Sequence, residues 1–354
     1  MANKEQLELL KAGVEGWNQW RRQDQKTKID LSGVDLGGFD LIDANLAGAK
    51  LDQANLSGAK LIESDLRGAR LERANLSRAK LERARLSGAK LGRAALEKAS
   101  LARADLSGAD LRGAVLEGSD LERANLSEAD LTGARLKRAH LSGAILCGAK
   151  LIDADLSGAD LSGANLAYAD LTRTNLVAAD LVNSNLVHAN VDHANVSKSK
   201  VYGINVWDLL GDFQEQQDLI ITPEFESVIT VDDIEIAQFV YLILNNRKIR
   251  DVINTLTSKT VLILGRFAIP ERKAVLDTLR EKLRDYDLLP IVFDFDRPTD
   301  KDFTETIKTL ASISYFVIAD VTNPRSSPLE LQATIPDYQI PFVPILQEGE
   351  KPFA

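Results

Sequence analysis

The chain has 354 residues, a net charge of −9, three histidines and one cysteine. The single cysteine, Cys147, excludes a disulfide framework and a cysteine-based zinc site. The start of the chain lacks a signal-peptide pattern, and no apolar stretch reaches the roughly 18 residues that a membrane span needs. We therefore expect a soluble, cytoplasmic protein with no membrane partner and, at ~150 residues per domain, two domains.

The amino-terminal segment, residues 1–28, contains a predicted helix over residues 4–22. Apolar residues recur in it at helical spacing, namely Leu7, Leu10, Val14 and Trp17. We expect this helix to cover the end of the repeat that follows, where an exposed edge would otherwise pair with other chains. A helix that binds a partner protein is the alternative.

Residues 29–206 form a repeat with a period of five. Leucine occupies 32 successive positions at five-residue intervals from Leu31 to Leu186, and valine continues this register to Val206. A small residue stands two positions before each centre from position 44 to 199, and 27 of these 32 residues are alanine. The other five are Ser64, Ser119, Thr174, Ser184 and Ser199.

A period of five fits neither a straight helix nor a straight strand. On an α-helix, five residues advance about 500°, so the leucines would spiral around the cylinder. On a strand, an odd period places successive leucines on opposite faces. The chain must therefore change direction once per pentad, so that the leucine and the small residue of each pentad both point to one axis.

The pentads, such as Ala54-Asn55-Leu56-Ser57-Gly58 and Ala109-Asp110-Leu111-Arg112-Gly113, resemble the pentapeptide-repeat family. This resemblance implies a β-solenoid: a right-handed, quadrilateral β-helix with four pentads per coil. The period alone does not distinguish three sides from four.

The outward residues of the repeat are electrically balanced. Residues 31–200 carry 22 acidic and 22 basic side chains, although residues 60–98 are mainly basic and residues 151–185 mainly acidic. Some pentapeptide-repeat proteins are thought to mimic DNA and bind topoisomerases, which needs a strongly acidic rod. Neutrality disfavours that function, and basic residues without interleaved aromatic residues disfavour nucleic acid as a partner.

Residues 207–258 are predicted to be a helical bridge. Residues 211–223 suggest a loop, and Asp232 or Asp233 can begin a helix that runs to about Asn245. A second apolar-faced helix follows it. These helices must pack on the next domain, on the last coil or on another copy of the chain.

Residues 259–354 alternate between strands and helices, which predicts an α/β domain with a parallel sheet. The expected strands are residues 261–265, 291–295, 315–320 and 342–346, and the expected helices are residues 271–286, 301–312 and a short helix from about 327. Ligands of such sheets bind beyond the carboxyl ends of the strands. The polar or glycine-containing residues at these ends are Gly265, Arg266, Phe267, Asp294, Asp320 and Asn323.

The string from Ala319 to Pro324, followed by Glu330, resembles two related groups, the Toll/interleukin-receptor-like (TIR-like) domains and the nucleoside deoxyribosyltransferase-like domains. The resemblance implies that Glu330 contacts a ribose and supports cleavage of a glycosidic bond. It also implies sugar or base contacts for Asp320 and Asn323. Ser327 replaces part of the Trp-Cys pair that precedes the carboxylate in many TIR enzymes.

Glycosidic cleavage often uses two carboxylates, and Asp320 or Asp294 can be the second. Gly265, Arg266, Phe267, Asp294 and Asn323 are then candidate nucleotide contacts. Residues 201–354 contain no histidine and no P-loop motif, and their net charge of −10 disfavours a polyanionic partner. We expect no metal and no cofactor, with NAD as a candidate substrate.

The sequence thus predicts an intracellular interaction or scaffold protein, in which a repeat rod carries a TIR-like nucleotide-binding or signalling domain. One alternative is a nucleotide N-glycosidase that acts on NAD through Glu330. The other is a topoisomerase-binding rod. Protein partners are expected, and self-association into a homo-oligomer stays open.

Overall fold

The computed structural model describes residues 3–24, 26–223, 228–265, 270–294, 310–311, 314–320 and 341–346. The chain divides into two compact units, Met1–Leu242 and Ile243–Ala354. The division falls inside residues 207–258, for which the sequence predicts a helical bridge. Glu330 and its neighbours lie outside the described residues.

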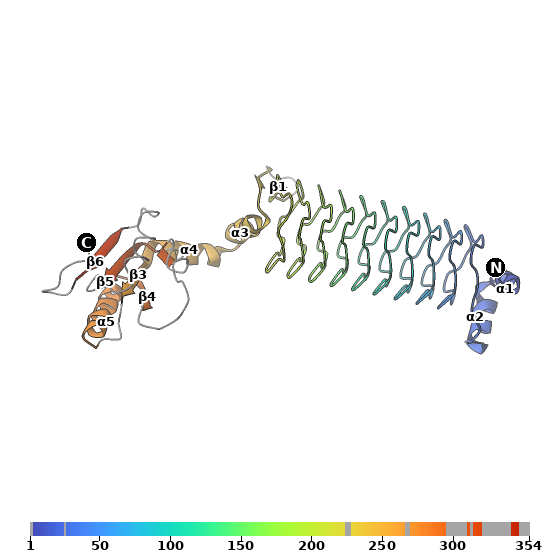
Figure 1. The fold of residues 1–354 in the computed structure, drawn as a ribbon, viewed down its shortest axis with the longest axis horizontal. Helices are drawn as coiled ribbons and strands as arrows, with labels where there is room; N and C mark the ends of the chain where they lie inside the picture. The colour runs from blue at the N-terminus through green and yellow to red at the C-terminus, as the bar shows by residue number, and fades with distance from the viewer. Residues whose placement is uncertain are drawn as a thin grey trace. The chain divides into compact units, whose positions relative to one another are not determined.

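The first unit is a stack of coils, drawn from blue to yellow in Figure 1. Every backbone bridge in the stack is parallel and joins residues 20 apart, from Asp30 with Lys50 to Lys200 with Ile220. One coil therefore contains 20 residues, or four pentads. The β-solenoid architecture and its four pentads per coil are confirmed.

The coil continues beyond the expected end of the repeat at Val206. Leu210, Glu215 and Ile220 still bridge to the residues 20 positions before them. The prediction of a loop over residues 211–223 is therefore wrong for this stretch. The leucine register ends before the backbone pairing does, because the last coil needs a hydrogen-bond partner but no longer needs a regular interior on both sides.

The interior of the rod is filled by the two inward positions of each pentad. The leucines from Leu31 to Leu186 are at most 1 % exposed, and the alanines between them are equally buried. The five hydroxyl residues that replace alanine are also buried. Their side chains donate hydrogen bonds to leucine carbonyls, as Ser119 Oγ does to Leu116 O at 2.7 Å and Thr174 Oγ1 does to Leu151 O at 2.8 Å. Every inward polar group therefore has a partner, which a dry interior requires.

Each pentad turns its corner in the same way. The N–H of the small residue donates to the carbonyl of the leucine three positions earlier, for example Ala114 N to Leu111 O at 2.9 Å. The second residue of the turn has a positive φ, such as 64° at Gly133 and 57° at Ala178. Glycine is common at this position because it adopts such angles without strain.

Two helices contact the first coil, α1 (Lys4–Ala12) and α2 (Val14–Gln23). The prediction of one continuous helix is wrong, because Gly13, with φ 140°, separates them. Leu10 and Trp17 are buried in the same core as the leucines. The Trp17 indole N–H donates to Asn45 O at 2.8 Å, so α2 is held by a hydrogen bond as well as by apolar contact.

Strands β1 (Leu219–Ile220) and β2 (Thr230–Val231) pair antiparallel at the other end of the rod, and helix α3 (Ile234–Asn245) follows them. Ile234 and Ala237 are buried in the rod's core. The N–H of Val206 donates to Gln238 Oε1 at 2.8 Å. Of the packing alternatives for this helix, the structure shows the last coil.

The second unit contains a four-stranded parallel sheet in the order β4-β3-β5-β6. Its described elements are α4 (Arg247–Lys259), β3 (Thr260–Gly265), α5 (Pro270–Asp285), β4 (Leu289–Asp294), β5 (Phe316–Asp320) and β6 (Phe342–Ile345). Alternate residues of β3 belong to separate apolar clusters, with Leu262 in one and Ile263 in the other. The predicted parallel sheet is confirmed. Of the predicted helix over 301–312, only residues 310–311 are described, and the short helix near 327 lies outside the described residues.

Candidate functional site

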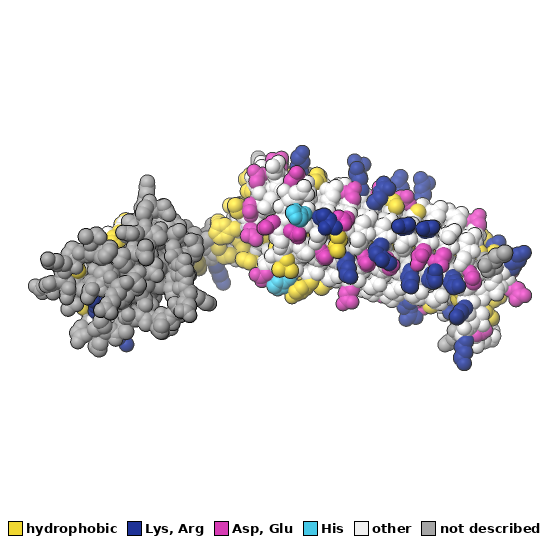
Figure 2. Space-filling model, viewed as in Figure 1, with side chains coloured by type: hydrophobic (Ala, Val, Ile, Leu, Met, Phe, Trp, Pro, Cys, Tyr) yellow, Lys and Arg dark blue, Asp and Glu magenta, His cyan; other side chains and the backbone are white. Residues whose placement is uncertain are grey.

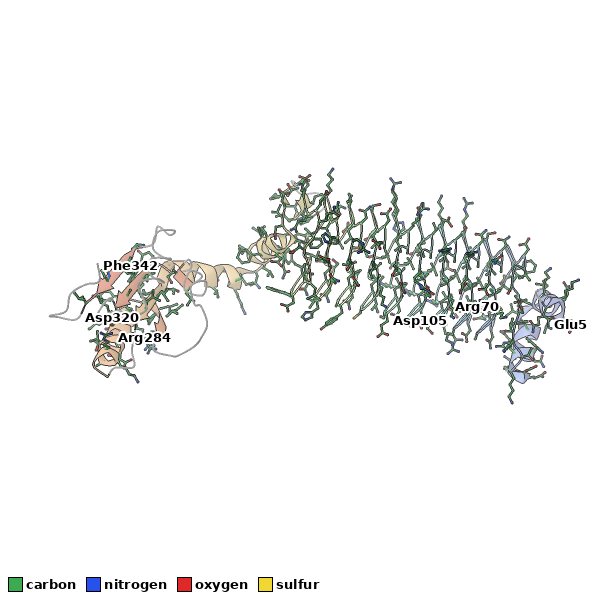
Figure 3. The ribbon with its side chains drawn as sticks, viewed as in Figure 1. Glu5, Arg70, Asp105, Arg284, Asp320 and Phe342 are labelled. Carbon is green, nitrogen blue, oxygen red and sulfur yellow. The ribbon has the colours of Figure 1, made fainter. Side chains whose placement is uncertain are left out.

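The carboxyl edge of the sheet brings together three of the predicted site residues. Gly265 ends β3 and is the register partner of Asp294, which ends β4. Asp320 ends β5, the strand on the other side of β3, and Figure 3 labels it at the end of that strand. Neighbouring strands thus place Gly265, Asp294 and Asp320 at one edge, as the sequence predicts.

Asp320 is nearly buried and faces a cation. Its side chain is 9 % exposed, and its Oδ2 lies 3.5 Å from an Arg272 Nη1 of helix α5. Arg272 is itself 17 % exposed, so the pair is largely withdrawn from water. Sequence reasoning missed Arg272, although it stands two residues after Pro270, in the first turn of a predicted helix that follows a strand. An ion pair of this kind holds the Asp320 carboxylate in place, which suits a structural or positioning role.

Four of the predicted site residues lie outside the described part of the chain: Arg266, Phe267, Asn323 and Glu330. The edge can therefore be described as a juxtaposition of Gly265, Asp294 and Asp320 with Arg272 beside it. Among the described residues, no group of three histidine, cysteine or carboxylate side chains is arranged to hold a metal ion.

The surface of the rod is the second candidate. The residue before each leucine projects outward, and residues 20 apart stack directly above one another in bridged columns. Basic and acidic side chains are interspersed over the visible face in Figure 2. Four such columns, one per side, run along the rod, so residue number modulo 20 gives the side on which a residue lies.

Several columns contain stacked like charges. Lys50, Arg70 and Lys90 follow one another in one column, and Asp160 bridges Asp180 in another. Like charges directly opposite in a sheet are destabilising. Some are relieved within the chain, as Arg70 is by Asp52 at 3.0 Å.

Ion pairs between outward residues hold some carboxylates ionised. The Arg112 side chain hydrogen-bonds Asp110 and lowers the pKa of that carboxyl. Arg173 does the same for Asp153 in the coil below, and the pKa of Asp153 is lowered chiefly by this side-chain hydrogen bond. These residues are half exposed or more, so each pair is worth at most about 1 kcal/mol.

An aromatic stripe runs along one corner of the last coils. The rings of Tyr168 and His188 stack with centroids 5.0 Å apart, and Trp207 stands one coil further. Tyr168 and Trp207 are well exposed. The sequence placed the three histidines on the surface, and the structure shows none of them buried. Within the described ranges, no helix is both long enough and apolar enough to cross a bilayer.

Comparison with known proteins identifies the repeat. Residues 29–197 match the family model for pentapeptide repeats, in eight copies over overlapping segments. No curated protein matches the chain significantly. Because the match ends at residue 197, it leaves the second unit without a family.

Solved structures of pentapeptide-repeat proteins resemble the rod. HetL, involved in heterocyst differentiation regulation in the cyanobacterium Nostoc sp. strain PCC 7120, is 29 % identical, with 60 % of this chain and 98 % of HetL covered and a TM-score of 0.30. QnrB1, a plasmid-mediated fluoroquinolone resistance protein, is 18 % identical, with 52 % and 93 % covered and a TM-score of 0.46. A protein of the Arabidopsis thaliana thylakoid lumen is 35 % identical, with 28 % and 65 % covered and a TM-score of 0.20. These TM-scores are low, so the fold follows from the bridge register and the family match.

Proposed function

We propose, from the pentapeptide repeats that occupy residues 29–197, that this protein is a scaffold that binds partner proteins along the sides of its rod. The carrying observation is the filled interior. The leucines are at most 1 % exposed, and the inward hydroxyls are bonded to backbone carbonyls, so the axis of the rod has no room for a ligand. Function in this unit is therefore carried by the outward side chains.

The ends of the rod are covered, which leaves its sides for partners. Helices α1 and α2 lie on the first coil, and α3 with the β1–β2 pair lies on the last. We assign these elements a capping role, because an open β-edge recruits other strands. The equal numbers of acidic and basic residues over 31–200 argue against a DNA-mimicking rod for topoisomerases, and the net charge of −10 over 201–354 argues against nucleic acid.

The test uses the full-length chain with a photo-crosslinking amino acid at a single position. One variant carries it on the outward corner at Ser107, and a second carries it at exposed Glu281 on helix α5. We expect partner proteins from the native cell extract to be crosslinked at Ser107. The scaffold role would be rejected if partners were captured only at Glu281 and at no outward position of the rod.

A nucleotide glycosidase acting on NAD is the second candidate, supported by the juxtaposition of Gly265, Asp294 and Asp320 at the sheet edge. In this proposal the second unit is the TIR-like domain, and Glu330 stabilises the oxocarbenium ion as nicotinamide leaves. Asp320, held by Arg272, would position the ribose.

Release of nicotinamide from NAD by the full chain tests this candidate. Glu330→Gln keeps the side-chain size and removes the charge, so a loss on the order of 10²-fold is expected if Glu330 is catalytic. Glu281→Gln, an exposed carboxylate on α5, is the matched control and should retain full activity. Absence of turnover in the wild-type protein would remove the glycosidase role and leave the scaffold role as it stands.

A further inference from the structure

One side of the rod has a charge pattern that inverts about its middle. Its outward bridge column is Asp40, Lys60, Lys80, Ser100, Asp120, His140, Asp160, Asp180 and Lys200. Read from either end towards Asp120, each charged residue meets one of opposite sign at the same distance from the centre. The matched pairs are Asp40 with Lys200, Lys60 with Asp180, and Lys80 with Asp160.

The charges of this column are incompletely neutralised within one chain. Lys60 bridges Lys80, and Asp160 bridges Asp180, so like charges stack in neighbouring coils. Lys60 pairs with Asp40 at 3.0 Å and Lys200 with Asp180 at 3.2 Å. Within the described part of the chain, Lys80 and Asp160 have no ion pair. Asp160 accepts hydrogen bonds only from Ser162.

We propose that this side of the rod is the interface for a second copy of the same chain, packed side by side and antiparallel. A two-fold axis at Asp120 brings Lys60 of one copy against Asp180 of the other, and Lys80 against Asp160. A two-fold interface is self-complementary, so each pair occurs twice. The repulsive Lys60–Lys80 and Asp160–Asp180 ladders then lie against each other, and both are relieved.

The flanking columns of the same side fit this register. Outward residues two positions after the bridge column include half-buried Ile62 and Val182, which the same axis places opposite each other. Residues two positions before it include Gly58, which the axis places opposite Ala178, so backbones approach without large side chains between them. The apolar pair adds contact area to the ion pairs.

The centre of the interface brings Asp120 against its own copy. Lys98 lies beside it, since the Cγ of Lys98 is 3.9 Å from the position of a Cβ built on Gly118. Each copy therefore supplies an ammonium group next to the two carboxylates. This arrangement neutralises the like charges on the axis.

The side that carries Lys50 does not have this symmetry. Its column is Asp30, Lys50, Arg70, Lys90, Asp110, Asp130, Lys150, Asp170 and Asn190. Each antiparallel register near its middle leaves at least one like-charge pair, such as Lys90 with Lys150 or Arg70 with Lys150. The two remaining sides carry mostly amides and few charges. Charge complementarity thus selects one side of four.

The size of the contact indicates a weak, salt-sensitive dimer. Nine coils at ~4.8 Å give a length of about 40 Å, and a side of about 10 Å gives a flat footprint of roughly 400 Å² per copy. Stable interfaces bury about 1,200–2,000 Å² in total. Exposed ion pairs are screened by salt, so we expect association to weaken as ionic strength rises.

Sedimentation of the full chain with single charge reversals tests the register. Lys80→Asp places a carboxylate opposite Asp160, and Asp160→Lys places an ammonium group opposite Lys80, so each variant alone should dimerise on the order of 10- to 100-fold more weakly. Neither change should harm the fold, because each removes a like-charge contact within its own column. A mixture of the two variants, and the double variant Lys80→Asp/Asp160→Lys, should recover wild-type affinity.

Lys90→Asp, on the side that carries Lys50, is the matched control and should leave dimerisation unchanged. Small-angle scattering should show a dimer with the length of one rod and a wider cross-section. A wild-type chain that stays monomeric into the millimolar range, an end-to-end dimer, or a dimer insensitive to Lys80→Asp would overturn the proposal. Such a failure leaves the scaffold function intact, because three other sides remain for partners.

Discussion

The two units of this chain place their chemistry in different ways. In the rod, each pentad buries a leucine and a small residue and exposes the other three, so inside and outside follow residue by residue from the sequence. In the second unit, strands are buried on both faces and polar groups collect where the strands end. A repeat therefore spreads potential binding groups over a long surface, whereas a parallel sheet concentrates them at one edge.

The largest expected effect tests the buried positions of the rod. Leu111 is 0 % exposed, so Leu111→Ala should lower the free energy of unfolding by roughly 2–5 kcal/mol, since a cavity opens that neighbouring coils cannot fill. Arg112→Ala, at the adjacent outward position, should lower it by about 1 kcal/mol or less. Denaturant titration measures both, and equal losses would show that the assignment of inside and outside is wrong.

A smaller effect is expected from the ion pair at the sheet edge. Asp320→Asn removes the charge that faces Arg272 in a nearly buried setting, and it should destabilise the second unit by about 2–3 kcal/mol. Calorimetry should show a lower Tm for the second unit and an unchanged transition for the rod. A double-mutant cycle with Arg272→Ala isolates the pair, and purely additive losses would contradict the role assigned to it.

The smallest effect concerns the corners of the coil. Gly133 and Ala178 occupy the same turn position with φ 64° and 57°, and no neighbouring atom lies within 4 Å of a Cβ built on Gly133. Gly133→Ala should therefore destabilise the rod by about 1 kcal/mol through backbone strain alone, and Ala178→Gly should relieve it by a similar amount. Thermal unfolding of both variants would refute the strain argument if the two shifts had the same sign.

The interior of the rod was predictable because one rule repeats in every pentad. The number of sides was not, since a period of five allows three or four, and only the 20-residue bridges distinguish them. Which outward residues share a side follows from that number, so the charge-inverted column through Asp120 was also hidden. The break at Gly13 was missed because the apolar spacing of Leu10, Val14 and Trp17 continues across it.

The sheet edge was predictable in part. Strand ends were located by their apolar runs, and parallel order brought Gly265, Asp294 and Asp320 together as expected. Arg272 could not be placed, because the sequence does not give the rotation of a helix about its own axis. Its pairing with Asp320 depends on that rotation.

The 20-residue coil makes the rod a device in which length and orientation change separately. An insertion of 20 residues lengthens the rod by one coil and leaves every column in line. An insertion of a single pentad preserves the buried leucine and alanine positions, yet it rotates everything after it by a quarter turn. Such an insertion between Lys80 and Asp160 would move the two residues to different sides, so a well-folded rod would lose its self-complementary face. Evolution can thus change the partners of this chain by changing phase, with no substitution at any contact.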